Sequence, residues 1–326
     1  MNYKQKILNT VGILTVAGVI TALVTPVAKS QDGSLIKIDG SSTVYPITEA
    51  VAEEYQIENQ GATQVTVGVS GTGGGFKKFC SEDAAVRTDI SNASRQIKEE
   101  EMAMCEAAGV EYIEIPVAYD AITVVANPEN PIESMTVEEL NQIWGPESEG
   151  QITNWSQVNP EWPDAEFSLF GPGADSGTFD GFTDKINGDE GASRTDYTPS
   201  EDDNVLVQGV SSDPNALGYF GYSYYEENQD QLKAIAIDNG EGAVVPSVET
   251  VRDGSYQPLS RPIYIYVNAD SANKPEVAEF VEYYLTNAEA LVPEVGSVPL
   301  TAEDYQKGIA RFQNGETGTT AAKPAE

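Results

Sequence analysis

The 326-residue chain contains no histidine. This absence removes the Ser-His and Cys-His pairs of nucleophilic catalysis and the commonest zinc ligand in proteins. Without histidine, a secreted phosphatase would depend on Asp or Glu to hold its metal ions. The acidic runs GDEG and SEDDN are more typical of solvated loops than of metal sites. The sequence therefore predicts no catalytic residue, no metal site and no cofactor.

Basic residues are also scarce, with 18 Lys and Arg against 52 Asp and Glu and a formal net charge of −34. Nucleic acid is excluded as a partner, because binding to phosphate backbones requires a basic surface. The long-range field of this chain opposes the approach of any anion. An anionic ligand would therefore have to be held by short-range hydrogen bonds.

Only the N-terminus carries a long apolar run. Lys4 and Lys6 precede an uncharged stretch from Ile7 to Ala28, and the segment ends in Ala28-Lys29-Ser30. This pattern predicts a secretory signal, residues 1–30, that is cleaved. An uncleaved membrane anchor is the alternative, since about 20 apolar residues can span a bilayer. Cleavage removes three lysines and takes the formal charge to −37, and we expect a soluble mature protein in the periplasm.

Cysteine occurs only twice, as Cys80 and Cys105. An even pair in an exported chain is more often a disulfide than a redox site, because the compartment is oxidising. We therefore expect Cys80 and Cys105 to be bonded to each other.

Strand-like and helix-like segments alternate along the mature chain, which is typical of α/β layers. SLIKIDG reads as a strand that ends at Gly40, and Ser42 or Thr43 is the natural N-cap of the helix that follows. In GTGGGFKKF we expect the helix to begin at Phe76, after the glycines. INGDEGASRTDYTPSEDDN has little apolar content and predicts a surface loop.

The chain is longer than one hydrophobic core usually serves, which indicates two domains. The apolar stretch YIEIPVAYDAITVVANP is long enough to cross between them, and PIYIYVN mirrors it later in the chain. We expect a signal peptide at 1–30, a first lobe at 31–120 plus 264–316, a second lobe at 121–263, and a disordered tail at 317–326.

Three loops share one physical design, in which a strand ends, a run of Gly, Ser and Thr follows, and an apolar helix starts. They are GSSTVYP, SGTGGGF and DSGTFDGF. Helix N-termini leave backbone N–H groups unpaired, and glycine lets an oxyanion approach them closely. The last loop lacks the glycine pattern of a nucleophile elbow, and GTGGGFKK lacks the ending of a Walker loop. The three loops together indicate a seat for an anion.

The segments DGSSTVYPITEA, GVSGTGGGFKKF, DISNASR and DSGTF, taken in order, resemble the phosphate-binding protein family of phosphate ABC transporters, the PstS-like family. The resemblance implies two α/β lobes of the type II-like periplasmic-binding-protein fold, each a mixed sheet flanked by helices. Hinge strands join the lobes, which close on phosphate. It also implies delivery of inorganic phosphate to an ABC permease at the inner membrane, and we expect a monomer that is not an enzyme.

Carried over to this chain, the resemblance implies a ligand set drawn from the three loops. Its members are Ser42, Thr43, Val44, Thr72, Gly73, Ser176, Gly177 and Thr178.

Two departures from the family pattern affect this assignment. The aspartate that accepts the proton of bound phosphate in family members is replaced here by Asn92, with Asp120 as a possible substitute acceptor. An arginine that precedes the second-lobe Ser-Gly-Thr is replaced by Pro172, and Arg95 is the expected replacement. The alternative for Arg95 is a surface ion pair with Glu99.

Two other functions compete with phosphate binding. One is a receptor for another oxyanion, such as sulfate, molybdate or phosphonate, and the other is a secreted phosphatase.

Overall fold

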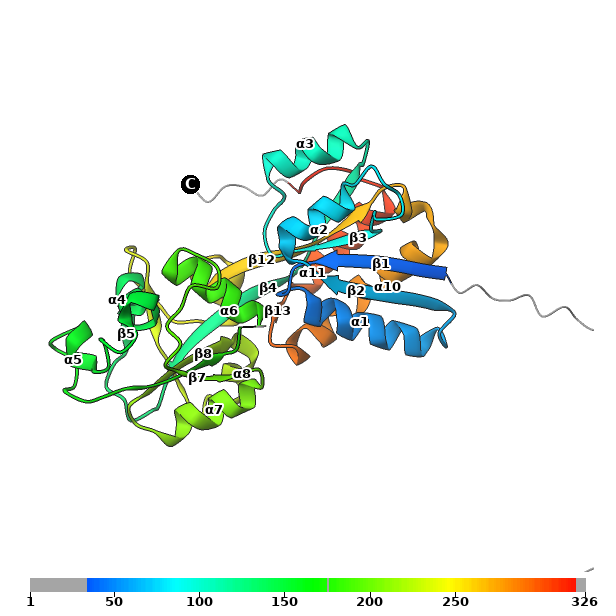
Figure 1. Cartoon of the computed structure of the whole chain (residues 1–326). Coiled ribbons are helices and arrows are strands. Elements are labelled where there is room, and N and C mark those ends of the chain that lie inside the picture. Colours follow the sequence, from blue (N-terminus) through cyan, green and yellow to red (C-terminus); the bar gives the residue numbers. More distant parts are fainter. Residues whose placement is uncertain (1–33, 175, 321–326) are drawn as a thin grey trace, which may run out of the picture. The chain divides into compact units, whose positions relative to one another are not determined.

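The computed structural model describes residues 34–174 and 176–320 (Figure 1). The predicted signal peptide lies outside the described residues, as do residues 321–326. The strands are β1 (Ser34–Gly40), β2 (Thr63–Val69), β3 (Ile90–Ala93), β4 (Tyr112–Ala126), β5 (Ser134–Thr136), β6 (Ser168–Pro172), β7 (Thr198–Ser200), β8 (Ala216–Gly221), β9 (Lys233–Ala234), β10 (Ala236–Asp238), β11 (Ala243–Val244), β12 (Ser260–Asn268) and β13 (Val298–Pro299).

Helices flank these strands and connect them, so the expected α/β class is confirmed. The α-helices are α1 (Tyr45–Glu58), α2 (Gly71–Phe79), α3 (Glu99–Ala107), α4 (Val137–Trp144), α5 (Trp155–Val158), α6 (Gly177–Phe182), α7 (Asp203–Ser212), α8 (Tyr222–Glu227), α9 (Val248–Arg252), α10 (Pro275–Glu294) and α11 (Ala302–Gln313). Shorter turns are the 3-10 helices η1 (Pro146–Ser148) and η3 (Ser271–Asn273) and the π-helix η2 (Thr183–Asn187).

One mixed sheet runs in the order β2-β1-β3-β12-β4-β8-β6-β7, with β13 and β9 also paired to β4. β1 is parallel to β2 and to β3, and β6 is parallel to β8 and to β7, whereas β12 and β4 pair in antiparallel fashion. A second, three-stranded sheet has the order β11-β10-β5. The carboxyl ends of β1, β2 and β3 therefore meet at one edge, where ligands of open α/β sheets commonly bind.

The long strand β4 runs from the helices and strands on one side of Figure 1 to those on the other. It contributes residues to two separate hydrophobic cores. Its first part, from Ile113 to Ala118, packs with residues of α1, α10 and α11. Its second part, from Ala121 to Ala126, packs with Trp144, Trp155 and their neighbours. Both parts of the strand are buried, and apart from Glu114 and Asp120 the strand is largely apolar. The exact division of the chain into lobes remains a prediction.

Two helix starts differ from expectation. α1 begins one or two residues later than predicted, with Val44 rather than Ser42 or Thr43 at the N-cap. α2 begins at Gly71 rather than at Phe76, so it contains the glycine run. A Cβ on Gly75 would lie 2.6 Å from Cα of Gly40. Glycine at this position therefore allows α2 to pack directly on β1.

The predicted disulfide between Cys80 and Cys105 is confirmed. Cys80 follows the last residue of α2, and Cys105 lies within α3. Both cysteines are buried in one apolar cluster with Phe76 and Tyr266. The bond thus links the two helices that flank the Ser94 to Lys98 segment.

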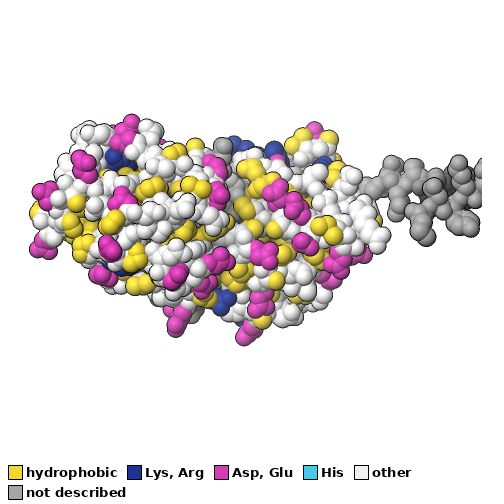
Figure 2. Space-filling view, turned by 90° about the horizontal axis from the view of Figure 1, so that it is seen from below, with side chains coloured by type: hydrophobic (Ala, Val, Ile, Leu, Met, Phe, Trp, Pro, Cys, Tyr) yellow, Lys and Arg dark blue, Asp and Glu magenta, His cyan; other side chains and the backbone are white. Residues whose placement is uncertain are grey.

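The acidic excess of the sequence appears at the surface. Figure 2 shows Asp and Glu side chains scattered over the face in view, with few Lys and Arg side chains among them. Within residues 34–174 and 176–320, no helix combines the length and the apolar character needed to cross a bilayer.

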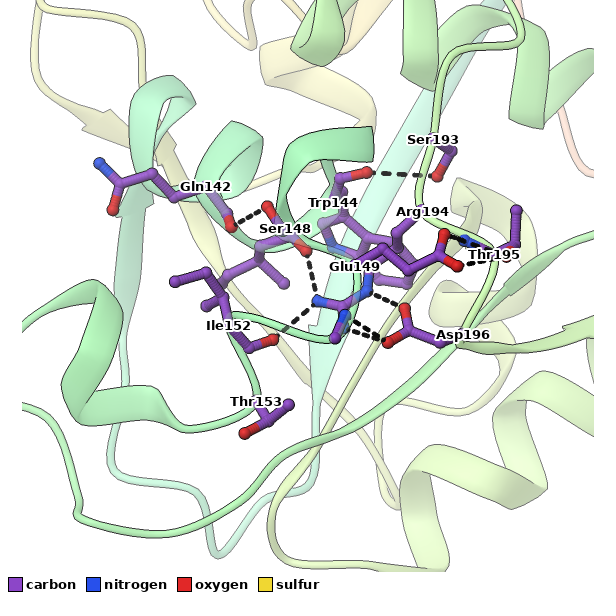
Figure 3. Close-up of polar contacts among 12 residues, drawn as sticks. Gln142, Trp144, Ser148, Glu149, Ile152, Thr153, Ser193, Arg194, Thr195 and Asp196 are labelled. Atoms are coloured by element: carbon purple, nitrogen blue, oxygen red, sulfur yellow. Dashed lines mark hydrogen bonds and ion pairs between the residues drawn. The ribbon is translucent and has the colours of Figure 1, made fainter.

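The predicted surface loop before α7 is anchored by a buried arginine, which was not expected (Figure 3). The Arg194 side chain is 2% exposed, and its Nη1 donates to the carbonyl oxygens of Ile143 (2.9 Å) and Ile152 (3.0 Å). Its Nε and Nη2 donate to the two carboxylate oxygens of Asp196. This ion pair holds the pKa of Asp196 below its usual range. The segment is therefore fixed to α4 rather than lying free at the surface.

Part of the predicted disordered tail is also ordered. Gly318 forms a parallel bridge with Ile113 of β4, and Thr320 hydrogen-bonds to Glu114 on the same strand. The expectation of disorder from residue 317 is thus wrong for Gly318 to Thr320. These residues are small and polar, but their backbone groups find partners on β4.

Candidate binding cleft

A cavity of about 950 Å³ opens where the loops after β1, β2 and β3 meet α6, η2 and the start of β12. The segments after β1, β2 and β3 contribute Ser41 to Thr43, Gly71 to Gly73, and Ser94 to Lys98 with the exception of Ile97. Hydroxyl and charged side chains dominate this lining. The cavity therefore suits a polar ligand, and all three of the segments GSSTVYP, SGTGGGF and DSGTFDGF contribute residues to its lining.

The first predicted loop bridges the two sides of the cavity. Ser42 Oγ donates to Oδ2 of Asp180 (3.0 Å), and Thr43 Oγ1 donates to the carbonyl oxygen of Gly177 (3.3 Å). Ser42 and Thr43 line the cavity. Val44 has no exposed surface and packs in the core beside Ile47, so its side chain does not reach the cavity.

The second predicted loop places Thr72 and Gly73 at the cavity wall. Thr72 Oγ1 lies 3.1 Å from Ser94 Oγ, and it accepts a hydrogen bond from the backbone N–H of Ser94 (3.1 Å). The loops after β2 and β3 are thus joined at the cavity, and they present two hydroxyls side by side.

The third predicted loop forms the start of α6. Ser176 is the N-cap, and its Oγ accepts from the backbone N–H of Thr178 (3.2 Å). A Cβ on Gly177 would lie 2.6 Å from both N and Cα of Thr43. The close approach of the two loops therefore requires glycine at 177. Ser176, Gly177 and Thr178 do not themselves line the cavity, whereas Asp180 and Gly181 of the same helix do.

Asn92 lies behind the cavity rather than in its wall. Its side chain is fully buried, and its Oδ1 accepts from Thr48 Oγ1 (3.1 Å). Ser94, two positions further on, lines the cavity. Sequence reasoning missed Ser94, although its position directly after the end of β3 was a usable signal.

Arg95 lines the cavity but is already engaged in an ion pair. Its Nη1 and Nη2 each donate to one carboxylate oxygen of Glu101 at 2.8 Å, and Nη1 also donates to the Gln96 carbonyl. The hydrogen bonds to Glu101 raise the pKa of Arg95. Its partner is thus Glu101, not the Glu99 considered from helix spacing. Three of its five N–H donors are committed within the protein.

A second arginine at the cavity, Arg261 of β12, was not identified from the sequence. Its Nε donates to Asp120 Oδ2 (3.2 Å), and its Nη2 lies 3.4 Å from Thr43 Oγ1. Asp120 and Arg261 are register partners on β4 and β12. Asp120 is buried behind Arg261 and does not line the cavity, and this burial raises its pKa while the guanidinium opposes the rise. Three of the five Arg261 donors remain available.

Carboxylates stand opposite these cations. Burial raises the pKa of Asp180, and the hydrogen bond from Ser42 and the charge of Arg261 oppose the rise. Burial also raises the pKa of Glu190, and the charges of Asp180 and Asp184 add to the effect. Asp184 pairs with Lys185 (2.8 Å). The cavity thus holds both hydrogen-bond donors and acceptors. The described residues contain no cluster of three or more Cys, Asp or Glu suited to a metal ion.

Comparison with known proteins gives consistent matches. Residues 24–288 match the model of the PBP superfamily domain. Protein SphX of Synechococcus elongatus is 50% identical over 311 residues, which cover 95% of this chain and 90% of that protein. The phosphate-binding protein PstS of Staphylococcus saprophyticus is 38% identical over 282 residues, or 86% and 84% of the two chains.

A solved structure extends the comparison to the fold. The crystal structure of a possible phosphate binding protein from Planctomyces limnophilus is 45% identical, with a TM-score of 0.81 and coverage of 87% of this chain and 99% of that one. The fold and the polar cleft at the strand ends define a solute-binding protein. The chain belongs to the PBP superfamily and, within it, to the family of the phosphate-binding protein PstS and of SphX.

Proposed function

We propose that this protein is an extracytoplasmic receptor that binds inorganic phosphate in the cleft and delivers it to an ABC permease. It acts as a monomeric binding protein and not as an enzyme. Names of relatives at 38% identity and the expected signal peptide support this assignment. The two sets of core residues that share β4 would act as lobes, because hinge closure is documented for periplasmic binding proteins.

The observation that carries the proposal is the composition of the cleft. Hydroxyls of Ser42, Thr43, Thr72 and Ser94 line the same cavity as the free donors of Arg261. A bound anion would take over the hydroxyl protons that Ser42 and Thr43 donate to Asp180 and to the Gly177 carbonyl in this structure. Hydroxyl and guanidinium donors are the groups that bind a tetrahedral oxyanion, and a guanidinium donates in a fork to two of its oxygens. In this proposal Arg261 carries the main charge and Arg95 contributes its two remaining donors.

Selectivity for phosphate over sulfate would come from Asp180. Its carboxylate lines the cleft and accepts from Ser42. A hydrogen phosphate ion can donate a proton to this carboxylate, whereas sulfate carries no proton at neutral pH and would face an unpaired negative charge. Asp180 replaces Asn92 as the proposed acceptor, because the Asn92 amide oxygen is turned toward Thr48.

Calorimetric titration of the mature chain tests the proposal. We expect heat from phosphate and clearly weaker binding of sulfate, molybdate and phosphonate. The variant Asp180→Asn should narrow the difference in affinity between phosphate and sulfate. Asp164→Asn, at an exposed carboxylate that does not line the cavity, should leave that difference unchanged. Absence of phosphate binding, equal affinity for sulfate, or turnover of a chromogenic phosphate ester by the pure protein would overturn the assignment.

A further inference from the structure

A buried carboxylate lies behind the cleft on β4. Glu114 has no exposed surface, and within residues 34–174 and 176–320 no Lys or Arg side chain forms an ion pair with it. Its Oε2 accepts from the Tyr266 hydroxyl (2.5 Å), and its Oε1 accepts from Gln96 Nε2 (3.1 Å). A buried charge without a cation is costly unless hydrogen bonds satisfy it. The position of Glu114 therefore depends on its neutral donors.

The C-terminal segment supplies two of these donors. The backbone N–H of Thr320 donates to Glu114 Oε1 (2.8 Å), and the Thr320 hydroxyl donates to the same oxygen (2.5 Å). Gly318 holds the segment in place, since its N–H donates to the Tyr112 carbonyl (2.7 Å). Arg311 Nη2 donates to the Gly318 carbonyl (2.6 Å). Gly318 and Thr320, at the two ends of this segment, are thus both hydrogen-bonded to residues of β4.

The same network reaches the wall of the cleft. Gln96 Nε2 contacts both Glu114 Oε1 and the Thr320 carbonyl (3.4 Å). The next residue, Ile97, donates its backbone N–H to the Tyr266 hydroxyl (2.9 Å), which in turn donates to Glu114. Gln96 and its neighbours Ser94, Arg95 and Lys98 line the cleft. Glu114 therefore fixes this loop from behind through two adjacent residues.

We propose that Thr320 is a positioning residue for the ligand site: through Glu114 it holds the Ser94 to Lys98 loop in the geometry that binds the anion. The C-terminal segment Gly318 to Thr320 is then part of the binding machinery, although it does not touch the cleft. The proposal rests on the proposed function for its ligand, inorganic phosphate.

Coupling between Thr320 and the ligand site is reciprocal, so it should appear both in the phosphate affinity and in hydrogen exchange at Thr320. Loss of the Thr320 hydroxyl should weaken phosphate binding, because Gln96 would lose the fixed carboxylate that orients it. Binding of phosphate should in turn slow hydrogen exchange of the Thr320 amide. A role in overall stability alone would give neither a local effect at residues 94–98 nor a ligand effect at Thr320.

The test compares Thr320→Val with Thr320→Ser and with the matched control Thr319→Val, an exposed threonine one position away. Phosphate titration and hydrogen exchange are measured on the mature full-length chain. We expect Thr320→Val to lose about fivefold or more in phosphate affinity, with faster exchange at the Ile97 amide. Thr320→Ser, which keeps the hydroxyl, and Thr319→Val should resemble the wild type.

Equal affinity and equal exchange at residues 94–98 in Thr320→Val and Thr319→Val would overturn the inference. If the wild-type protein bound no phosphate, the proposed function would fall instead. Exchange at the Ile97 amide would then decide the positioning role by itself: faster exchange in Thr320→Val supports it, and unchanged exchange rejects it.

Discussion

The two arginines at the cleft differ in the number of donors that the protein leaves free. Arg95 commits three N–H groups to Glu101 and Gln96, whereas Arg261 commits two to Asp120 and Thr43. Arg261→Ala should therefore weaken phosphate binding by about 2 kcal/mol or more, as expected for a broken buried charge contact. Arg95→Ala should cost less. Titration calorimetry at fixed salt measures both.

Two controls separate ligand contact from damage to the fold. Arg261→Lys keeps a charge beside Asp120 but loses the guanidinium fork, so it should still weaken binding. Arg87→Ala removes a cation outside the cleft and should leave the affinity unchanged. Wild-type affinity in Arg261→Ala would remove this residue from the site.

The residues of the cleft were predictable where the signal is local. Ser42 and Thr43 lie between β1 and α1, and Thr72 lies in the first turn of α2 just after β2, so their place at the sheet edge can be inferred from the sequence alone. Arg261 arrives from far along the chain, and its place is set by the pairing of β12 with β4, which no local pattern shows. A charged residue at the start of an otherwise apolar strand was the available signal.

At the scale of elements, strands and long helices were easier to predict than their ends. β1 has the range expected from SLIKIDG, Ser34–Gly40, because its apolar pattern is strong. The start of α2 was misplaced because glycine disfavours helices in isolation, whereas here the contact of Gly75 with Gly40 favours it. Burial of Arg194 depends on carbonyl groups of α4 and of the segment after η1, which the acidic loop sequence does not reveal.

The start of α7 carries three consecutive acidic residues, Glu201, Asp202 and Asp203. Burial, with added repulsion from Asp202 and Glu201, raises the pKa of Asp203 to about 7. The carboxyl of an unfolded chain titrates near ~4. Between about pH 4 and 7 the folded state therefore holds a proton that the unfolded state has released, and the free energy of unfolding falls as the pH rises through this window.

The asparagine side chain of the Asp203→Asn variant does not ionise. The variant should therefore keep the free energy of unfolding that the wild type loses as the pH rises. The gain in free energy of unfolding over the wild type should be small at pH 4, grow toward pH 7 and level off above about 8, reaching on the order of 1–2 kcal/mol. Urea unfolding at a series of pH values measures it. Asp230→Asn, at an exposed carboxylate, serves as the control. A difference that stays flat from pH 4 to 8 would contradict the assignment.

At the scale of the whole molecule, the cleft depends on chain segments that are distant in sequence. β4 and β12 bring Asp120 and Arg261 beside Thr43, and Gly318 to Thr320 return to β4 behind the loop after β3. The alternation of strands and helices predicted the α/β class. The role of the C-terminal segment was not predictable, because its composition resembles that of a disordered tail and its partners lie about 200 residues away.

The most direct test of the central claim is a crystal structure of the mature protein grown with saturating phosphate. The account predicts a tetrahedral anion in the cleft, within hydrogen-bond distance of the Ser42 and Thr72 hydroxyls and of the Arg261 guanidinium, with one oxygen facing Asp180. A cleft that contains only water under these conditions, or an anion bound elsewhere on the molecule, would contradict it.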